Sequence, residues 1–237
     1  MSQTAYATYP PAPLVAQPQI DTLGSIGTNK PAIAPAMQRL IADIEREHIS
    51  KRQPLDAAHR VAGLLKRYLL EADLLLPEQC IANPRRYVVH ETYDDPGGDF
   101  LIRVLTWFPR TATPIHDHSS WCVSGIYRGY EREMQYGLAH LEAEGGQQEV
   151  LIPVSSNIRG PGDVEALLPP GDIHMVMNTG TEIALSIHIY GADIRDMAMP
   201  GGRIYDLPIV AERPQLQGAL SDARSYGRAL RASFSPN

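Results

Sequence analysis

Two stretches decide the fold of this chain: TPIHDH at residues 113–118 and PPGDIHMVMN at residues 169–178. The first places two imidazoles at positions i and i+2. If it is a strand, His116 and His118 point to the same face, as two ligands of one metal must. In the second stretch, a Pro-x-Gly turn leads His174 into a following strand. His116, His118 and His174 are therefore candidate ligands of one metal. From the HxH pair alone, two partly exposed histidines on an edge strand are the alternative, and the combined pattern of the two stretches favours the metal site.

The residues around these stretches are typical of short β-strands. Segments rich in β-branched and aromatic residues alternate with turn sequences such as DPGG at 95–98 and GPG at 160–162. The predicted strands are residues 86–92, 99–107, 121–127, 131–137 and 183–190. Short strands separated by such turns predict a sandwich or a barrel.

The two ends of the chain have different patterns. Residues 1–34 are rich in Pro, Ala, Thr and Gln without periodicity, and predict a disordered or loosely packed arm. Apolar residues then recur at three- and four-residue spacing in two runs, which predicts two helices within residues 35–82. The barrel is expected over 83–212. A polar tail follows over 213–237, in which an amphipathic helix is predicted around Ala219 to Ala232.

Composition excludes several classes of protein. The chain has 237 residues, a net charge of −6 with acidic and basic residues interspersed, and two cysteines, Cys80 and Cys122. The charge argues against a nucleic-acid surface, and two cysteines exclude a disulfide framework. The N-terminus lacks the features of a secretory signal, and no apolar run approaches the roughly 20 residues that span a bilayer. We expect a cytoplasmic protein, a monomer or small homo-oligomer, without a membrane or nucleic-acid partner.

The two histidine stretches together resemble the two cupin motifs. An HxH pair, a glycine eleven residues after His118 and the pattern PxGxxHxxxN follow one another as they do in those motifs. The resemblance implies a mainly β fold: a jelly-roll, double-stranded β-helix barrel of the cupin type, with the N-terminal helices packed outside. Cupins commonly place a glutamate ligand four residues after the second histidine, and this chain has Cys122 there.

The missing glutamate has a consequence for charge. Residues 119–124 include no acid, so we expect three neutral imidazoles rather than two histidines and a carboxylate. Three neutral ligands leave a divalent cation with its full 2+ charge, which favours an anionic and soft ligand such as a thiolate. Iron and zinc both accept imidazole, and the histidines alone do not separate them.

A second set of polar residues lies in the segment LSIHIYG at 185–191, where apolar and polar residues alternate. Ser186, His188 and Tyr190 share one face of the predicted strand. Three polar groups in line can form a hydrogen-bond relay. The alternation is also that of an ordinary amphipathic strand with a wet polar face.

The order of four motifs between residues 83 and 195 resembles that of the thiol dioxygenase family, which includes cysteine dioxygenase and 3-mercaptopropionate dioxygenase. The motifs are HDH, an Arg-Gly turn, PxGxxH and SxHxYG. The resemblance implies one Fe(2+) per chain, held by the three histidines, with a small thiol and O2 as substrates. It makes Ser186, His188 and Tyr190 an outer-sphere network whose tyrosine hydroxyl approaches the substrate and oxygen.

Two positions bear on which thiol is used. Under the same resemblance, Arg86 falls where cysteine dioxygenases carry the arginine that clamps the substrate carboxylate, and 3-mercaptopropionate dioxygenases carry glutamine there. Cys122 falls near the cysteine that forms a thioether crosslink with the active-site tyrosine, here Tyr190. Met199 stands where the mercaptopropionate enzymes carry an arginine. From the residues alone, a solvated arginine and a packing cysteine are the alternatives.

We therefore predict a non-haem iron thiol dioxygenase that oxidises a small thiol carboxylate, L-cysteine first, to its sulfinic acid. The alternative within this class is 3-mercaptopropionate dioxygenation. The alternative from another class is a non-catalytic cupin that binds a metal and a ligand as a sensor, which has no need of the relay at Ser186, His188 and Tyr190. A cupin isomerase or hydrolase would be favoured by a carboxylate ligand, which the sequence does not offer.

Overall fold

The computed structural model describes residues 32–143, 146–191 and 202–210. Most of the predicted N-terminal arm and the whole predicted tail lie outside these ranges, so the helix expected in the tail stays a prediction.

Two helices begin the described chain, as predicted. α1 (Pro35–Arg46) and α2 (Pro54–Tyr68) both start at a proline, whose fixed φ angle suits the first helical turn. A short 3-10 helix follows each of them, η1 (Ile49–Lys51) and η2 (Pro77–Cys80). The apolar stripe of each long helix is buried, so the periodicity marks a packing surface.

Antiparallel strands make up most of the rest of the described chain. The strands that the sequence predicts are present with bounds that differ by a few residues: β1 (Val88–Asp94), β2 (Phe100–Trp107), β3 (Cys122–Arg128), β4 (Glu131–Ala143), β7 (His174–Asn178) and β8 (Ala184–Gly191). Sequence analysis missed β5 (Gly146–Arg159) and β6 (Val164–Leu167). Residues 153–158 of β5 alternate between half-buried and exposed positions, and the exposed ones include Val154 and Ile158, so the strand lacks the usual pattern of buried apolar and exposed polar residues. β6 has four residues only.

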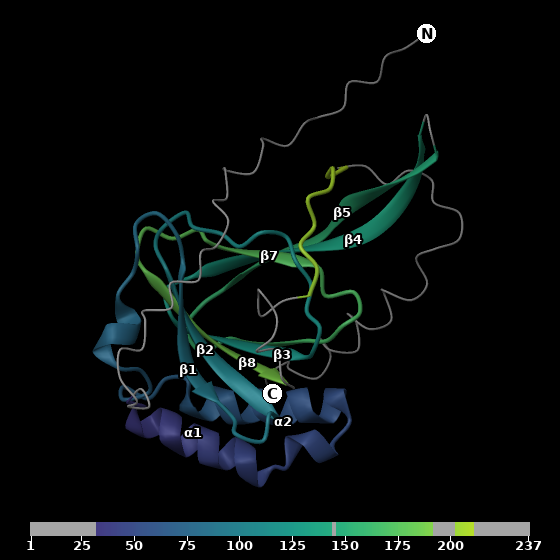
Figure 1. Cartoon of the computed structure of the whole chain (residues 1–237). Helices are drawn as coiled ribbons and strands as arrows, with labels where there is room; N and C mark the ends of the chain where they lie inside the picture. The colour runs from purple at the N-terminus through teal and green to yellow at the C-terminus, as the bar shows by residue number, and fades with distance from the viewer. Residues whose placement is uncertain (1–31, 144–145, 192–201, 211–237) are drawn as a thin grey trace, which may run out of the picture.

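The strands form two sheets that face each other (Figure 1). One has the order β1-β2-β8-β3-β6, and the other β5-β4-β7. Residues 112–116 run antiparallel to β7 through isolated bridges, so they extend the smaller sheet as an irregular fourth strand. The chain passes repeatedly from one sheet to the other, as in a jelly roll or double-stranded β-helix. The predicted fold class, a mainly β cupin-type barrel with helices outside, is confirmed.

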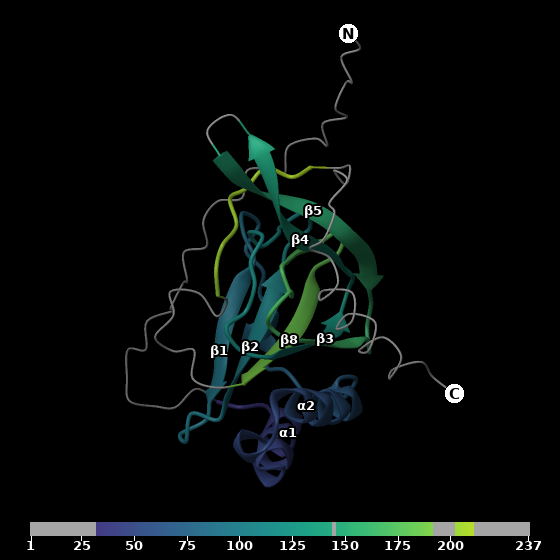
Figure 2. The same ribbon diagram turned by 90° about the vertical axis from the view of Figure 1, so that its right-hand side faces the viewer.

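The helices cover the outer face of the larger sheet (Figure 2). α2 packs against β3, β6 and β8. Gly125 of β3 allows this close approach, because a Cβ atom there would lie 2.8 Å from Cδ2 of Leu65. Apolar residues of both helices and of the outward strand face form one buried cluster. The inward face of the same sheet is therefore free to carry polar residues in the barrel interior.

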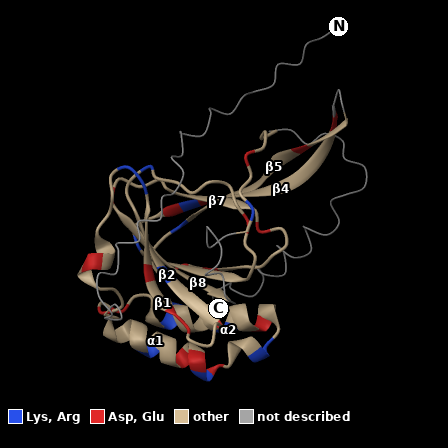
Figure 3. Ribbon diagram, viewed as in Figure 1, with Lys and Arg blue, Asp and Glu red and all other residues tan. Residues whose placement is uncertain are grey.

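Acidic and basic residues are interspersed over the two helices (Figure 3). Arg52 and Arg60, for example, each pair with Asp56 in the first turn of α2. Exposed ion pairs of this kind contribute little to stability, because water and salt screen their attraction. Within the described ranges, no helix is long and apolar enough to cross a membrane.

Candidate metal centre

His116, His118 and His174 meet inside the barrel. One nitrogen of each ring lies within 4.8 Å of the corresponding nitrogens of the other two. The ring centroids are 4.7 to 5.1 Å apart, and the three residues are 9%, 5% and 3% exposed. The predicted ligands thus form one buried group that can hold a metal ion.

The hydrogen bonds of the three rings leave the same nitrogen of each ring free for a metal. His174 Nδ1 lies 2.7 Å from Glu133 Oε1, and His118 Nδ1 lies 2.8 Å from Asp172 Oδ2. A carboxylate oxygen only accepts, so both rings carry their proton on Nδ1 and donate it. His116 Nδ1 donates likewise to a backbone oxygen at 3.0 Å. Each Nε2 atom therefore presents a lone pair.

Burial keeps two of the three rings neutral. It lowers the pKa of His116 and His174 well below the usual value, because a charged imidazolium would lose its hydration there. The Nε2 atom of His174 is buried and has no hydrogen-bond partner among the described residues. A buried acceptor without a partner is costly unless it binds something. Neutral imidazoles suit several divalent transition metals, so the group fits such a metal without specifying which one.

The segment that carries His116 and His118 is not a regular strand, which corrects one assumption of the sequence analysis. His116 and His174 exchange both backbone hydrogen bonds, at 2.9 and 2.8 Å, and this isolated bridge sets their rings side by side. Asp117, between the two ligands, instead accepts hydrogen bonds from the Tyr205 hydroxyl and the Arg203 backbone, both at 2.6 Å. An extended segment tied down in this way preserves the alternation that the motif requires.

Two buried carboxylates lie one hydrogen bond behind the ligands, and sequence analysis missed both. Glu133 is on β4 of the smaller sheet, and Asp172 is in the turn before β7. The prediction of three histidine ligands is unaffected, but the prediction of an uncompensated 2+ charge is wrong, because acidic groups adjoin two of the rings. The sequence places Asp172 two residues before His174 in the second motif and Glu133 in a predicted strand. Neither position indicates which histidine ring the carboxylate contacts.

Ser186, His188 and Tyr190 lie on the inward face of β8 and are buried. Ser186 Oγ lies 3.0 Å from His188 Nε2 and accepts a hydrogen bond from Trp107 Nε1 at 2.9 Å. The ring of Tyr190 lies 5.9 Å from that of His118 and 6.2 Å from that of His188, between centroids. This polar face is therefore interior rather than wet, and it reaches the metal ligands.

Cys122 and Tyr190 stand directly opposite each other on the neighbouring strands β3 and β8. They share a small buried cluster with Leu101 and Leu167. Burial raises the pKa of both the thiol and the phenol, so both keep their protons at neutral pH. The two side chains are neighbours, as the predicted thioether crosslink requires, and the crosslink itself stays a prediction.

The predicted carboxylate clamp, Arg86, is half-buried in the turn before β1. The next residue, Tyr87, reaches the interior: its ring stacks on Trp107 with centroids 4.9 Å apart, and burial raises its pKa to about 12. Arg103 of β2 also faces the interior, opposite His188 in register. The role of Arg86 stays a prediction, whereas Tyr87 and Arg103 are interior residues that sequence analysis missed.

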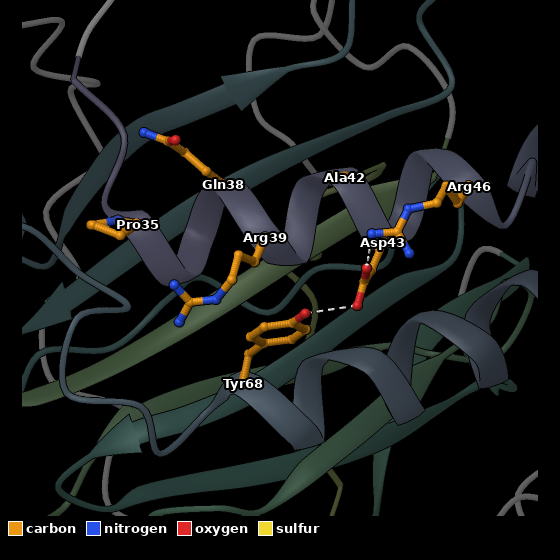
Figure 4. Close-up of a pocket in the computed structure, with 7 residues that line it drawn as sticks. All are labelled: Pro35, Gln38, Arg39, Ala42, Asp43, Arg46 and Tyr68. Carbon is orange, nitrogen blue, oxygen red and sulfur yellow. Dashed lines mark hydrogen bonds and ion pairs between the residues drawn. The ribbon is translucent and has the colours of Figure 1, made fainter.

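A surface hollow of about 460 Å³ lies away from this centre, along α1 and the end of α2 (Figure 4). Its polar side chains have partners. Tyr68 donates to Asp43 at 2.7 Å, and Asp43 forms an ion pair with Arg46. Arg39 forms an ion pair with Glu71 outside the hollow. None of its described side chains is a buried polar group without a partner. Among the described residues, the group that can hold a metal lies in the barrel and not in this hollow.

The chain is similar in fold to several solved structures at low sequence identity. No family model matches the chain. A protein with a double-stranded beta-helix domain from Klebsiella pneumoniae is similar at 15% identity and a TM-score of 0.38, over 52% of this chain and 93% of that one. A cupin superfamily protein from Desulfitobacterium hafniense is similar at 13% identity and a TM-score of 0.37, over 52% and 95%. The assignment of the fold rests on the strand order, and these likenesses indicate no substrate.

Proposed function

We propose that this protein is a non-haem iron thiol dioxygenase that converts a small thiol carboxylate, L-cysteine first, into its sulfinic acid. The observation that carries the proposal is the position of Tyr190, whose ring lies 5.9 Å from that of His118 and next to the buried pair of Ser186 and His188. Three histidines that only store a metal need no hydroxyl, imidazole and phenol beside them. The order of the motifs in the sequence supports the same reading.

The proposed reaction is R–SH + O2 giving R–SO2H, with both oxygen atoms joined to the sulfur. The sulfur supplies all the electrons, so the reaction needs no second reductant. Fe(2+) held by the Nε2 atoms of His116, His118 and His174 would supply the one-electron chemistry that lets O2 react with a closed-shell thiol.

The chain's own residues have three tasks in this reaction. The Nδ1–H hydrogen bonds hold the histidine rings so that their Nε2 atoms converge. Leu101, Leu167 and Cys122 form an apolar wall around Tyr190 that excludes water. Because burial raises the pKa of Tyr190, its phenol keeps its proton and donates it in a hydrogen bond to an oxygen of the reacting group. The ring of His188 lies next to that of Tyr190, and we assign to it the transfer of a proton.

L-cysteine also carries a carboxylate, and a guanidinium is the side chain best suited to bind it. We propose Arg86 for this contact, with Arg103 as the interior alternative. The NH1 group of Arg103 already donates to Asp94 Oδ1 at 2.6 Å, so Arg103 would have to share its donors. The variants Arg86→Gln and Arg103→Gln separate the two.

Whichever of the two arginines binds the carboxylate, its glutamine variant should have a higher KM for L-cysteine. The KM of that variant for cysteamine, a thiol without a carboxylate, should be unchanged. If neither variant changes the KM for L-cysteine, both guanidinium assignments are wrong.

Oxygen uptake by metal-loaded protein is the deciding experiment. The full chain is freed of metal, loaded with Fe(2+) or Zn(2+), and given L-cysteine, 3-mercaptopropionate or cysteamine. We expect O2 consumption and sulfinate formation with Fe(2+) only, and both atoms of labelled oxygen in the product. A higher kcat/KM for 3-mercaptopropionate would reassign the substrate. If the Fe(2+)-loaded protein consumes no O2 with any of these thiols, the proposed enzymatic function is refuted, and the alternative of a metal- and ligand-binding sensor is favoured.

The role of the tyrosine hydroxyl has its own test. Tyr190→Phe keeps the ring but removes the hydroxyl, and should lower kcat by about 10²- to 10⁴-fold without changing metal content. Tyr93→Phe is the matched control, because Tyr93 donates to Glu45 on the helix side of the sheet. If Tyr190→Phe keeps wild-type turnover, the hydroxyl has no part in the reaction.

A further inference from the structure

The hydroxyl of Ser186 lies among three polar groups inside the barrel. Trp107 Nε1 is 2.9 Å and His188 Nε2 is 3.0 Å from Ser186 Oγ. The carboxyl of Glu131 interacts with the same hydroxyl from the facing sheet. That contact is loose, because neither oxygen of Glu131 has a partner within hydrogen-bond limits among the described residues, although both oxygens are buried. A relay through Ser186 requires this contact to shorten to a hydrogen bond.

The hydrogen-bonding capacity of one hydroxyl allows two arrangements of this group. An indole N–H only donates, so Trp107 always occupies one lone pair of Ser186 Oγ. One lone pair and one proton remain for the other two groups. If Glu131 is protonated, it donates to Ser186, Ser186 donates to His188 Nε2, and His188 carries its own proton on Nδ1. If Glu131 is a carboxylate, Ser186 donates to it, His188 Nε2 donates to Ser186, and Nδ1 is bare.

The direction of the relay follows from what lies at its other end. The Nδ1 atom of His188 is 4.0 Å from the sulfur of Cys122, and Cys122 faces Tyr190 across the strand pair. In these two arrangements, the protonation state of Glu131 determines whether His188 carries a proton on Nδ1, the nitrogen that faces the candidate site.

We propose that Glu131 is a proton-holding residue that sets the tautomer of His188 and delivers one proton toward Cys122 and Tyr190. In this step the proton of Glu131 passes to Ser186 Oγ, the proton of Ser186 passes to His188 Nε2, and the proton on His188 Nδ1 leaves to a basic oxygen on the substrate side. Glu131 ends as a carboxylate and His188 stays neutral, so protons and charge balance. The use of this proton in oxygen chemistry rests on the proposed function, but the tautomer switch does not.

The surroundings of Glu131 suit a group that exchanges a proton near neutrality. Burial raises the pKa of Glu131 to about 7, Arg159 of β5 and the serine hydroxyl oppose this rise, and Glu133 on the same strand adds to it. Glu165 of β6 pairs with Arg159 at 3.1 Å and completes the charged groups of this cluster. His188 stays neutral throughout, because burial lowers its pKa well below the usual value.

Long-range proton–nitrogen NMR on the full chain, metal-free and zinc-loaded, tests the switch, because the two ring nitrogens of a neutral histidine differ in shift according to which one carries the proton. In the wild type, His188 should change from the Nδ1–H to the Nε2–H tautomer as the pH rises through about 7; its signals are those lost in His188→Asn. In Glu131→Leu the pH dependence should disappear. In Ser186→Ala the infrared band of the protonated Glu131 carboxyl should still titrate, while His188 no longer follows it.

Glu165→Gln is the matched control, because it removes another carboxyl of the cluster but leaves Glu131 and Ser186 in place; it should keep the switch. A wild-type His188 with one tautomer on both sides of pH 7 overturns the proposal, as does a switch that survives in Glu131→Leu. None of these measurements needs thiol turnover. Thiol oxidation without the switch would therefore refute this inference alone, and the switch without thiol oxidation would refute the proposed function alone.

Discussion

Replacing Glu133 by glutamine tests how far metal binding depends on the carboxylates behind the ligands. Glu133 is fully buried, and its Oε1 accepts the Nδ1 proton of His174 at 2.7 Å, a short charge-assisted hydrogen bond. Glutamine keeps the volume and one acceptor but removes the negative charge. Outer-shell partners of this kind change metal affinity about 10- to 100-fold. That corresponds to about 1.4–2.7 kcal/mol, similar to the about 1.5–3 kcal/mol of a hydrogen bond to a charged group.

The assay is competition between the protein and a chromophoric chelator for Zn(2+) at neutral pH. Glu133→Gln should raise the dissociation constant by about 10- to 100-fold, and Asp172→Asn should act in the same direction through His118. Glu149→Gln is the control, because Glu149 forms its ion pairs on the exposed side of β5, and its affinity should be that of the wild type. A folded Glu133→Gln protein that binds zinc within about twofold of the wild type would refute the dependence.

Three further predictions concern stability. Between pH 4.5 and about 7 the folded chain keeps a proton on Glu131 that the unfolded chain releases, so the unfolding free energy falls by about 3 kcal/mol as the pH rises through this window. Urea unfolding should show that Glu131→Gln gains stability over the wild type across the same window, and parallel pH profiles would contradict this. Gly125→Ala forces its new methyl group to within 2.8 Å of a leucine on α2 and should lower the unfolding free energy by about 1–3 kcal/mol. In Gly137→Ala the new methyl group makes an ordinary 3.5 Å contact, so this variant should keep the unfolding free energy of the wild type. Equal melting temperatures of the two variants would count against close packing of α2. A double-mutant cycle of Trp107→Phe with Ser186→Ala should give a coupling of about 0.5–1.5 kcal/mol for the buried indole hydrogen bond, and a coupling near zero would mean that this bond does not contribute.

The metal ligands could be predicted from sequence because their arrangement is local. His116 and His118 are two residues apart in an extended segment, and the glycine of the turn before His174 has a φ of 97°, a conformation that strongly favours glycine. Both signals lie within ten residues of the side chains that they place. The loss of regular strand structure around His116 did not affect the result, because alternation needs only an extended backbone.

The carboxylates behind the ligands could not be found in the same way, because they depend on pairing between distant segments. Glu133 lies 41 residues before His174, and Asp172 lies 54 residues after His118. Glu133 comes next to His174 only because β4 pairs with β7 in the smaller sheet. The residues that neighbour Cys122 in sequence therefore include neither of these carboxylates.

The segment before β1 shows how sensitive such predictions are to one residue. Side chains of an extended chain alternate between faces, so a shift of one position exchanges interior and exterior. The structure brings Tyr87 against Trp107. The predicted clamp, Arg86, is half-buried next to it, and its role stays a prediction. Arg103 carried no recognisable signal, because it is an isolated charge within an otherwise apolar strand; its inward direction follows only from its register with His188.

The position of the two carboxylates also changes the reason to expect a thiol at this site. From sequence, we expect a thiolate because three neutral ligands leave the cation with its full charge. Glu133 and Asp172 adjoin two of the rings and reduce that charge without occupying coordination positions, which a carboxylate ligand would do. Charge alone then does not select the substrate. The open coordination positions and the apolar wall around Tyr190 select it instead. Glu133→Gln separates these explanations, because it makes the site more positive. If charge draws the thiolate, this variant binds L-cysteine more tightly in its zinc-loaded form, and if open positions decide, its affinity for the thiol stays unchanged while its affinity for the metal falls.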